Sequence, residues 1–148
     1  MTDRHILLVE DNPDDRDLTI RSLKKNHVLN PVTVAINGAD AIAVLLGDDR
    51  KAGDAPALIL LDLKLPKVGG LEVLRRLRAD QRTRLVPVVV LTSSRQEEDL
   101  RVAYELGANG YVRKPVKFSE FTEVIRTIGL YWLLINEPPP EALPGLQV

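Results

Sequence analysis

The sequence predicts an α/β domain: a parallel five-stranded sheet with helices on both faces. The first observation is an alternation of short aliphatic runs with longer amphipathic segments, which is typical of strands joined by helical crossovers. The second observation is the composition of the runs. Residues 6–9 and 58–61 are apolar at every position, as expected for strands that are buried on both sides.

The start of the first helix carries the clearest local signals. Asn12 can cap the helix, Pro13 suits its first position, and Asp14 and Asp15 place negative charge in the first turn. This helix should end near Lys25. In the same half of the chain, strands are expected at 6–9, 31–35 and 58–61, a second helix from residue 38, and a polar surface loop at 48–56.

The second half repeats the alternation. A leucine face opposite an arginine face predicts the third helix. Ser94 and Glu97 fit a capping box for the fourth helix, which should stop at Gly107. Pro87 lies near the start of the fourth strand, where a missing N–H donor is tolerated. The elements are expected at 71–78 (helix), 86–91 (strand), 94–107 (helix), 110–112 (strand) and from 119 onward (helix).

Composition restricts the function classes. The 148 residues carry a net charge of −1, with 45% hydrophobic and 28% charged residues, which indicates one globular domain and no general bias toward nucleic acid. We expect this domain at 1–135 and a proline-rich tail at 136–148. Without cysteine there is no disulfide or thiolate chemistry. The chain lacks a signal-peptide pattern, and its longest late apolar run is too short to cross a membrane, so a soluble, cytoplasmic protein is expected.

Asp62 is the most informative residue. It follows directly after the aliphatic strand 58–61, and burying a carboxylate is costly unless it is paired or protonated. We therefore expect Asp62 to lie where the strand emerges, at the mouth of a site. Taken alone, an acid at a strand end is more often a turn or cap residue.

Other strand ends supply matching chemistry. Glu10 and Asp11 follow the first strand, Thr92 the fourth and Lys114 the fifth. Parallel sheets bind ligands at the carboxyl ends of their strands. Three carboxylates require a cation, and oxygen ligands at an accessible site suit Mg²⁺. With Thr92 and Lys114 nearby, the set favours binding of a phosphoryl group, with Asp62 as the nucleophile. Each residue also has an ordinary interpretation: solubilising loop, helix cap or solvated lysine.

These residues resemble the receiver domain of bacterial two-component response regulators. The resemblance covers about residues 4–130. It rests on Glu10–Asn12, on Asp62 with Pro66 and Gly70, on Leu91–Ser93, and on Gly107–Ala108 through Lys114–Pro115. It implies the flavodoxin-like (CheY-like) doubly wound sheet with strand order 2-1-3-4-5, the order found in a chemotaxis member of the family.

The resemblance also implies roles for individual residues. Asp62 would accept phosphate from a sensor histidine kinase. Mg²⁺ (or Mn²⁺) would be held by Glu10, Asp11, Asp62 and the backbone carbonyl of Lys64. Thr92 and Lys114 would contact the phosphoryl oxygens, and the protein would catalyse only its own phosphotransfer and dephosphorylation.

Further implications concern signal output. Tyr111 matches an aromatic switch that turns inward once Thr92 moves toward the phosphate, so that the surface of the last helices and strand changes. The Lys114–Pro115 bond is expected to be cis. Lys64 and Ser94 occupy positions expected to tune hydrolysis of the acyl phosphate.

A finer resemblance is to stand-alone response regulators of phytochrome-type histidine kinases. It rests on the insert 48–56, the sequence LLDLKLP at residues 60–66, the residues Leu91–Ser94 and the aromatic pair Tyr131–Trp132. No output domain is expected, so the protein should act through protein contacts and not by direct DNA binding. Other histidine kinases use similar receivers, and a non-phytochrome kinase is an alternative partner.

The apolar segment 130–135 is a second candidate surface. Apolar patches of this kind often mark partner surfaces, although the segment could instead fold back on its own domain. We predict a homodimer. The predicted interface residues are Phe121, Ile125, Leu130, Tyr131, Trp132 and Leu134.

Three other functions are weighed against phosphoacceptance. A phosphatase or mutase with an Asp nucleophile would usually carry a second acid two residues on, where this chain has Lys64. A flavodoxin-type cofactor binder would need a glycine- and hydroxyl-rich loop after the first strand, but Glu10 and Asp11 would repel an anion there. A phosphate-independent scaffold remains the main alternative.

Overall fold

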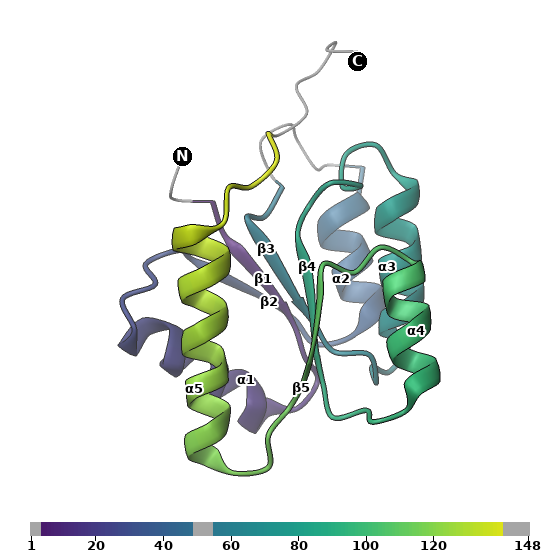
Figure 1. Cartoon of the computed structure of the whole chain (residues 1–148). Coiled ribbons are helices and arrows are strands. Elements are labelled where there is room, and N and C mark those ends of the chain that lie inside the picture. Colours follow the sequence, from purple (N-terminus) through teal and green to yellow (C-terminus); the bar gives the residue numbers. More distant parts are fainter. Residues whose placement is uncertain (1–3, 49–54, 141–148) are drawn as a thin grey trace.

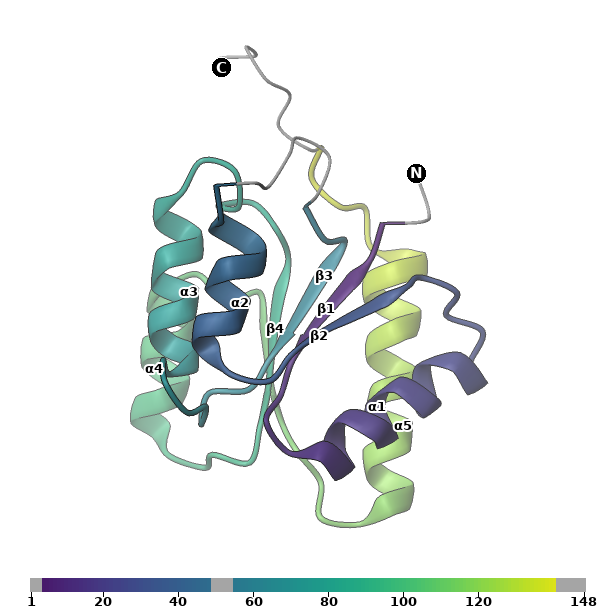
Figure 2. The ribbon, with the colours of Figure 1, turned by 180° about the vertical axis from the view of Figure 1, so that it is seen from behind.

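The computed structural model describes residues 4–48 and 55–140, and within them a parallel sheet of five strands in the order β2-β1-β3-β4-β5. Figure 1 shows helices on both sides of this sheet, and Figure 2 shows the same arrangement from behind. The predicted α/β class and strand order are confirmed. The central strands β1 and β3 run side by side, with Ile6 opposite Leu58 and Val9 opposite Leu61. Most of the 48–56 insert lies outside the described residues.

Strands and helices alternate along the chain as expected. The strands are β1 (Ile6–Val9), β2 (Val32–Ala35), β3 (Leu58–Leu61), β4 (Val88–Thr92) and β5 (Gly110–Arg113). The helices are α1 (Pro13–Lys25), α2 (Gly38–Leu46), α3 (Gly70–Ala79), α4 (Glu97–Glu105) and α5 (Phe118–Gly129).

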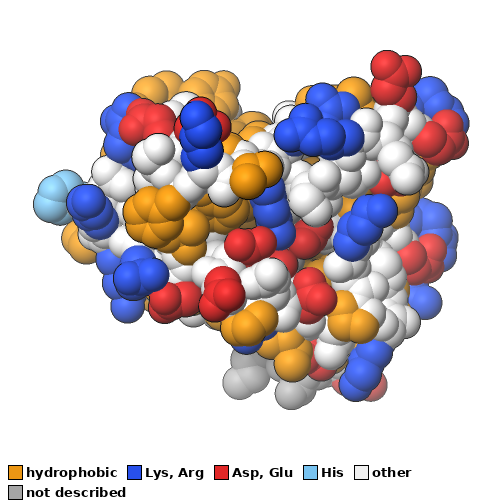
Figure 3. Space-filling model, turned by 90° about the horizontal axis from the view of Figure 1, so that it is seen from below, with side chains coloured by type: hydrophobic (Ala, Val, Ile, Leu, Met, Phe, Trp, Pro, Cys, Tyr) orange, Lys and Arg blue, Asp and Glu red, His pale blue; other side chains and the backbone are white. Residues whose placement is uncertain are grey.

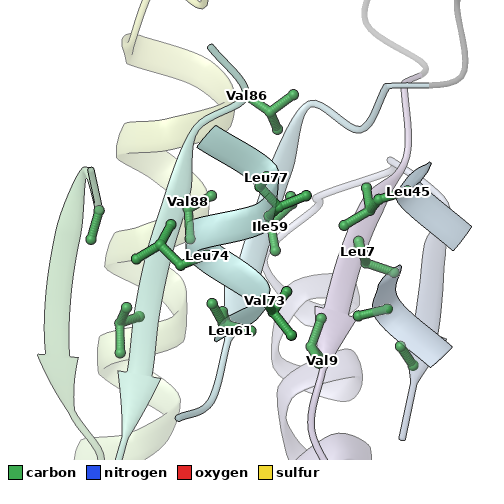
Figure 4. Packing of buried hydrophobic residues seen from close by; sticks show 14 of the residues in the cluster. Leu7, Val9, Leu45, Ile59, Leu61, Val73, Leu74, Leu77, Val86 and Val88 are labelled. Carbon is green, nitrogen blue, oxygen red and sulfur yellow. The ribbon is translucent and has the colours of Figure 1, made fainter. Parts of the chain in front are cut away.

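Alternation along each strand divides the core into two layers. In β1, Leu7 and Val9 face α2 and α3, whereas Ile6 and Leu8 face α1 and α5. Figure 4 shows the first layer, in which side chains of α3 pack onto β1, β3 and β4. Because β1, β3 and β4 are buried on both faces, they consist of apolar residues except for Thr92 at the end of β4.

The helix ends agree with the sequence signals in all but one case. The side chain of Asn12 accepts hydrogen bonds from the backbone N–H groups of Asp14 and Asp15, which caps α1 as predicted. Gly107 follows α4 with φ of +100°, a backbone conformation that favours glycine. The capping box is wrong: Gln96 is the N-cap residue of α4, and Ser94 Oγ instead donates to Asp99 Oδ2 at 2.6 Å.

The chain continues past α5 in a π-helical segment, Leu130–Ile135. Trp132 and Leu133 pack partly against the α1/α5 layer of the core. The Trp132 ring also lies beside Gly110 of β5, where a Cβ would come within 3.9 Å of it. Leu134 is 69% exposed. The segment therefore folds back on the domain with one side and leaves the other side in solvent.

Two glycines permit close approaches around the loop between β3 and α3. A Cβ on Gly70 would lie 2.3 Å from the carbonyl oxygen of Asp62, and a Cβ on Gly38 would lie 1.9 Å from that of Val68. Neither distance is possible for a real side chain. The starts of α2 and α3 can therefore press directly against the backbone that carries Asp62.

Candidate functional site

Charged and polar side chains from four strands meet at the carboxyl edge of the sheet. Glu10 follows β1, Asp62 follows β3, Thr92 ends β4 and Lys114 follows β5. Figure 3 views the molecule from this side and shows acidic side chains gathered around a basic one. Glu10, Asp62 and Thr92 are buried, with 2%, 6% and 0% of their surface exposed.

Lys114 forms hydrogen bonds with three carboxylates of the site. Its Nζ donates to Glu10 Oε1 at 2.6 Å, to Asp15 Oδ2 at 2.9 Å and to Asp62 Oδ2 at 3.1 Å. An ammonium group has three N–H donors, so these three carboxylates use all of them. The Lys114 backbone N–H also donates to the Thr92 carbonyl at 2.8 Å, which fixes the chain just after β5.

The electrostatics of the pair Glu10–Lys114 follow from burial and charge. Burial raises the pKa of Glu10 to about 7, assisted by the negative charge of Asp62 and opposed by the hydrogen bond from Lys114. Burial by itself would lower the pKa of Lys114, but the hydrogen bond to Glu10 and the charges of its other partners outweigh burial and raise that pKa. Lys114 is therefore a permanent cation, whereas Glu10 can change protonation near neutral pH.

Three carboxylates are close enough to share a metal ion. Glu10, Asp11 and Asp62 each offer an oxygen atom, and these atoms lie within 4.8 Å of one another. Asp11 is exposed, so the cluster opens to solvent on that side. An all-oxygen set with water access fits a hard divalent ion such as Mg²⁺, which binds through one or two carboxylates and keeps several waters.

The Asp62 backbone is held on two sides. Its N–H donates to the Val9 carbonyl at 3.1 Å, which extends the pairing of β1 with β3 by one residue. The Lys64 N–H approaches Asp62 Oδ1 at 3.4 Å. Gly70 N–H donates to the Leu63 carbonyl at 2.9 Å, so the start of α3 clamps the loop from behind. The carboxylate of Asp62 is thus presented from a rigid support.

Thr92 is linked to the start of α4. Ser94 N–H donates to Thr92 Oγ1 at 3.3 Å, and the Ser94 hydroxyl donates to Asp99. The Tyr111 ring packs against the α2/α3 layer, and its hydroxyl is buried without a hydrogen-bond partner among the residues that the structure describes. Burying a hydroxyl group without a hydrogen bond costs free energy. The hydroxyl of Tyr111 therefore does not stabilise the observed position of the ring.

Two sequence-based expectations are corrected. Among the described residues no peptide bond is cis, so the expected cis bond at Lys114–Pro115 is wrong. The trans form is intrinsically favoured even before proline, by about 0.5–1 kcal/mol. Phe121 and Ile125 are 4% and 0% exposed in the core of their own domain, so they cannot form part of a dimer surface.

One residue of the site was not identified from the sequence. The sequence predicts only a first-turn acid of α1 at Asp15, yet its carboxylate contacts Lys114. The signal was available in principle: a helix that begins directly after Glu10 and Asp11 must carry its first turn past the same edge of the sheet. Nothing in the sequence indicated which of Asp14 and Asp15 would face inward.

Comparison with known families identifies the family of this chain. Residues 6–126 match the response regulator receiver domain family. The chain belongs to this family. The receiver domain is a phosphoacceptor signalling module of two-component systems.

Several relatives span nearly the whole chain. The probable methanogenesis regulatory protein FilR2 of Methanothrix harundinacea is 37% identical over 137 residues, which cover 93% of this chain and 88% of that protein. Response regulator Rcp1 of Synechocystis sp. is 36% identical over 129 residues, which cover 86% of this chain and 88% of that one.

Solved structures agree with this placement. The Mn²⁺-bound form of Rcp1 superposes with a TM-score of 0.85 at 34% identity, covering 93% of this chain and 99% of that one. The bacteriophytochrome response regulator AtBRR is 50% identical with a TM-score of 0.68, covering 90% and 98%. This receiver domain therefore resembles the response regulators of phytochrome systems. In the described part of the chain, no helix is long and apolar enough to cross a membrane.

Proposed function

We propose that Asp62 accepts a phosphoryl group from the phosphohistidine of a sensor histidine kinase. In this step the P–N bond to the histidine breaks and a P–O bond to a carboxylate oxygen of Asp62 forms. The product is an acyl phosphate, and water later returns Asp62 to its free form. The protein catalyses only these two reactions on its own side chain.

The observation that carries the proposal is the contact of Lys114 Nζ with Asp62 Oδ2 at 3.1 Å inside a buried acidic cluster. A cation that already touches the nucleophile is placed to neutralise the charge that arrives with the phosphoryl group. Thr92, buried at the end of the neighbouring strand, offers a hydroxyl donor to the same place. No catalytic base is needed, because Asp62 attacks as a carboxylate.

A divalent metal completes the proposed chemistry. Glu10, Asp11 and Asp62, with the backbone carbonyl of Lys64, would hold Mg²⁺ or Mn²⁺, and the ion would supply positive charge next to the phosphoryl oxygens. The Mn²⁺-bound structure of Rcp1 supports a metal site in this family. In this chain Glu10 and Asp62 also hold Lys114 in place, so the same carboxylates orient both cations.

For signal output we propose a shift of Thr92 and Tyr111. The Ser94 link between Thr92 and Asp99 couples the phosphorylation site to the start of α4. Among the described residues the Tyr111 hydroxyl has no hydrogen-bond partner, so no hydrogen bond of this hydroxyl opposes movement of the ring. Phosphorylation would thus alter the surface of α4, β5 and α5, and the protein would signal through protein contacts.

The proposed kinase is of the phytochrome type. Support comes from relatives: RtBRR and AtBRR, both described as bacteriophytochrome response regulators, share 48% and 50% of their residues with this chain. Kinase choice is tested by mixing the protein with phosphorylated bacteriophytochrome and with an unrelated histidine kinase. Transfer within seconds from the first alone would support the assignment, and equal transfer from both would contradict it.

The deciding experiment for phosphoacceptance is labelling in Mg²⁺ with a small acyl-phosphate donor. Wild type should gain one phosphate that is lost in hydroxylamine, as expected for an acyl phosphate. Asp62→Asn should gain none, and Asp48→Asn, an exposed acid distant in sequence, should behave as wild type. No label on wild type would favour a phosphate-independent scaffold, and an equal label on Asp62→Asn would refute Asp62 as the acceptor.

We also propose that the protein forms a homodimer through the exposed side of 130–135. Leu130, Tyr131 and Leu134 are 42%, 47% and 69% exposed, and together they form an apolar surface at the end of α5. Trp132 contributes by its T-shaped contact with Tyr131, at 5.2 Å between ring centroids. Sedimentation should show a dimer that Leu134→Asp weakens; a wild-type monomer at tens of micromolar, with and without phosphate, would exclude it.

A further inference from the structure

Asp15 occupies one of the three N–H donors of Lys114. The Nζ···Oδ2 distance is 2.9 Å, shorter than the 3.1 Å to Asp62. A lysine that stabilises a phosphoryl group must offer a donor to it. With all three donors engaged by carboxylates, that offer requires one of the existing partners to give way.

The three carboxylates differ in how each could release its N–H donor of Lys114. Asp62 loses its charge on that oxygen when it becomes an acyl phosphate, and Glu10 belongs to the cluster of carboxylates that could hold a metal. Asp15 takes part in neither change. It reaches Lys114 from α1, with its side chain 29% exposed, against 3% for Glu10 and 7% for Asp62.

The backbone of Asp15 is fixed in place. Its N–H donates to the cap residue Asn12 at 3.0 Å, and its carbonyl accepts from the buried Thr19 hydroxyl at 2.7 Å. The carboxylate is therefore presented by the first turn of a capped helix and does not depend on a mobile loop.

We infer that Asp15 is a restraining residue: it competes with the phosphoryl group for Lys114 and so slows phosphorylation of Asp62. The inference rests on the proposed function, because it concerns the same acceptor. Its physical basis is that a carboxylate holding the ammonium must be displaced, or share it, when the anionic group arrives. Asp15 also places a negative charge next to Lys114, and this charge repels the anionic phosphoryl group as it approaches.

The test compares two neighbouring acids of the same helix turn. Asp15→Asn removes the charged partner of Lys114, whereas Asp14→Asn removes an equal charge from an exposed residue and serves as the matched control. Initial rates of Asp62 phosphorylation are measured with acetyl phosphate in saturating Mg²⁺. We expect Asp15→Asn to react about three- to tenfold faster than wild type, and Asp14→Asn to change the rate less than twofold.

A second measurement avoids turnover. Beryllofluoride, a stable analogue of the phosphoryl group, is titrated and followed by fluorine NMR. Its affinity should rise in Asp15→Asn by a factor similar to the rate. In a Lys114→Ala background, Asp15→Asn should have no effect on either quantity, because the restraint acts through the ammonium. Thermal melting of each variant confirms that it is folded.

The outcomes separate the two proposals. If wild type takes neither phosphate nor beryllofluoride, the proposed function fails. If wild type reacts but Asp15→Asn equals Asp14→Asn, reacts more slowly, or keeps its effect without Lys114, the restraint is refuted and the phosphoacceptor assignment stands.

Discussion

Two partly buried cations lie at opposite edges of the sheet and are held in different ways. Lys114, at the carboxyl edge, is paired with three carboxylates. Arg78, on α3, reaches the opposite edge, and its hydrogen bonds within 4–48 and 55–140 are all to neutral oxygens. Its acceptors are the carbonyls of Thr83, Arg84, Val86 and Gly107 and the side-chain oxygen of Asn109.

The difference separates a reactive site from a structural one. Carboxylates can exchange a lysine for a metal ion or a proton, so the contacts of Lys114 can be rearranged during function. Backbone carbonyls have no such alternative, so Arg78 stays bound and ties the end of α3 to the loops before β4 and β5. Burial lowers the pKa of Arg78 because no carboxylate compensates for it, although a guanidinium remains charged.

The largest effect on stability is expected at Arg78. Arg78→Ala leaves several carbonyls without donors and should lower the free energy of unfolding by about 3 kcal/mol. The phosphorylation rate of the folded fraction should stay within about twofold of wild type. Denaturant unfolding and acetyl-phosphate labelling measure the two quantities. Arg76→Ala, an exposed neighbour on the same helix, is the control. A large loss of rate with unchanged stability would remove the distinction between the two edges.

Lys114 should show the opposite profile. Lys114→Ala removes the cation beside Asp62, and the phosphorylation rate should fall about a hundredfold, the size of effect seen when one charge-stabilising donor is removed from an active site. Lys117→Ala, exposed in the same loop, should retain the wild-type rate. Initial rates at saturating donor and Mg²⁺ decide the matter, and a loss below threefold would mean that Lys114 is a structural cation like Arg78.

Metal binding should depend on pH at the carboxyl edge. The pKa of Glu10 is raised to about 7, so below pH 7 the side chain is mostly protonated and must release a proton to bind a cation. We expect Mg²⁺ affinity to fall by up to about tenfold per pH unit as the pH drops from 7 to 5.5, and to level off above pH 8. Titration calorimetry in buffers of different ionisation enthalpy detects the released proton. Glu10→Gln should bind more weakly and lose that proton release.

The smallest effect is expected at Asn109. Its side-chain oxygen accepts from Arg78 at 2.9 Å and from Val88 N–H at 2.8 Å, which links the arginine to the start of β4. Asn109→Ala should destabilise the fold by about 1 kcal/mol, because the residue is exposed and water can replace part of the loss. Chemical denaturation measures it, and the double variant with Arg78→Ala should be less than additive.

The carboxyl edge was predictable because its residues follow directly after apolar strands. Glu10, Asp62 and Thr92 each end or follow such a strand, whereas Lys114 follows the less apolar β5, and parallel strands bring their ends to one edge. For β1 and β3, four aliphatic residues in a row were enough to predict a strand that is buried on both faces. The start of α1 was equally local, since Asn12 caps the helix through atoms only two and three residues away.

The opposite edge was not predictable in the same way. Nothing about Arg78 in the sequence distinguishes it from the arginines beside it, because its acceptors lie 5 to 31 residues away and most are backbone atoms. Ser94 shows the same limit. Its neighbours suggested a capping box, but the hydroxyl bonds to Asp99 once α4 begins at Glu97 and not earlier.

The sequence by itself determined the strand alternation and the placement of Glu10, Asp62, Thr92 and Lys114 at one edge of the sheet, because each of these depends on where a strand ends. Only the tertiary structure decided which charges touch. Lys114 meets Asp15 across 99 residues, and Phe121 and Ile125 turn into the core while Leu134 stays outside. Those outcomes depend on how helices rotate against the sheet, and side-chain packing across the whole domain sets that rotation.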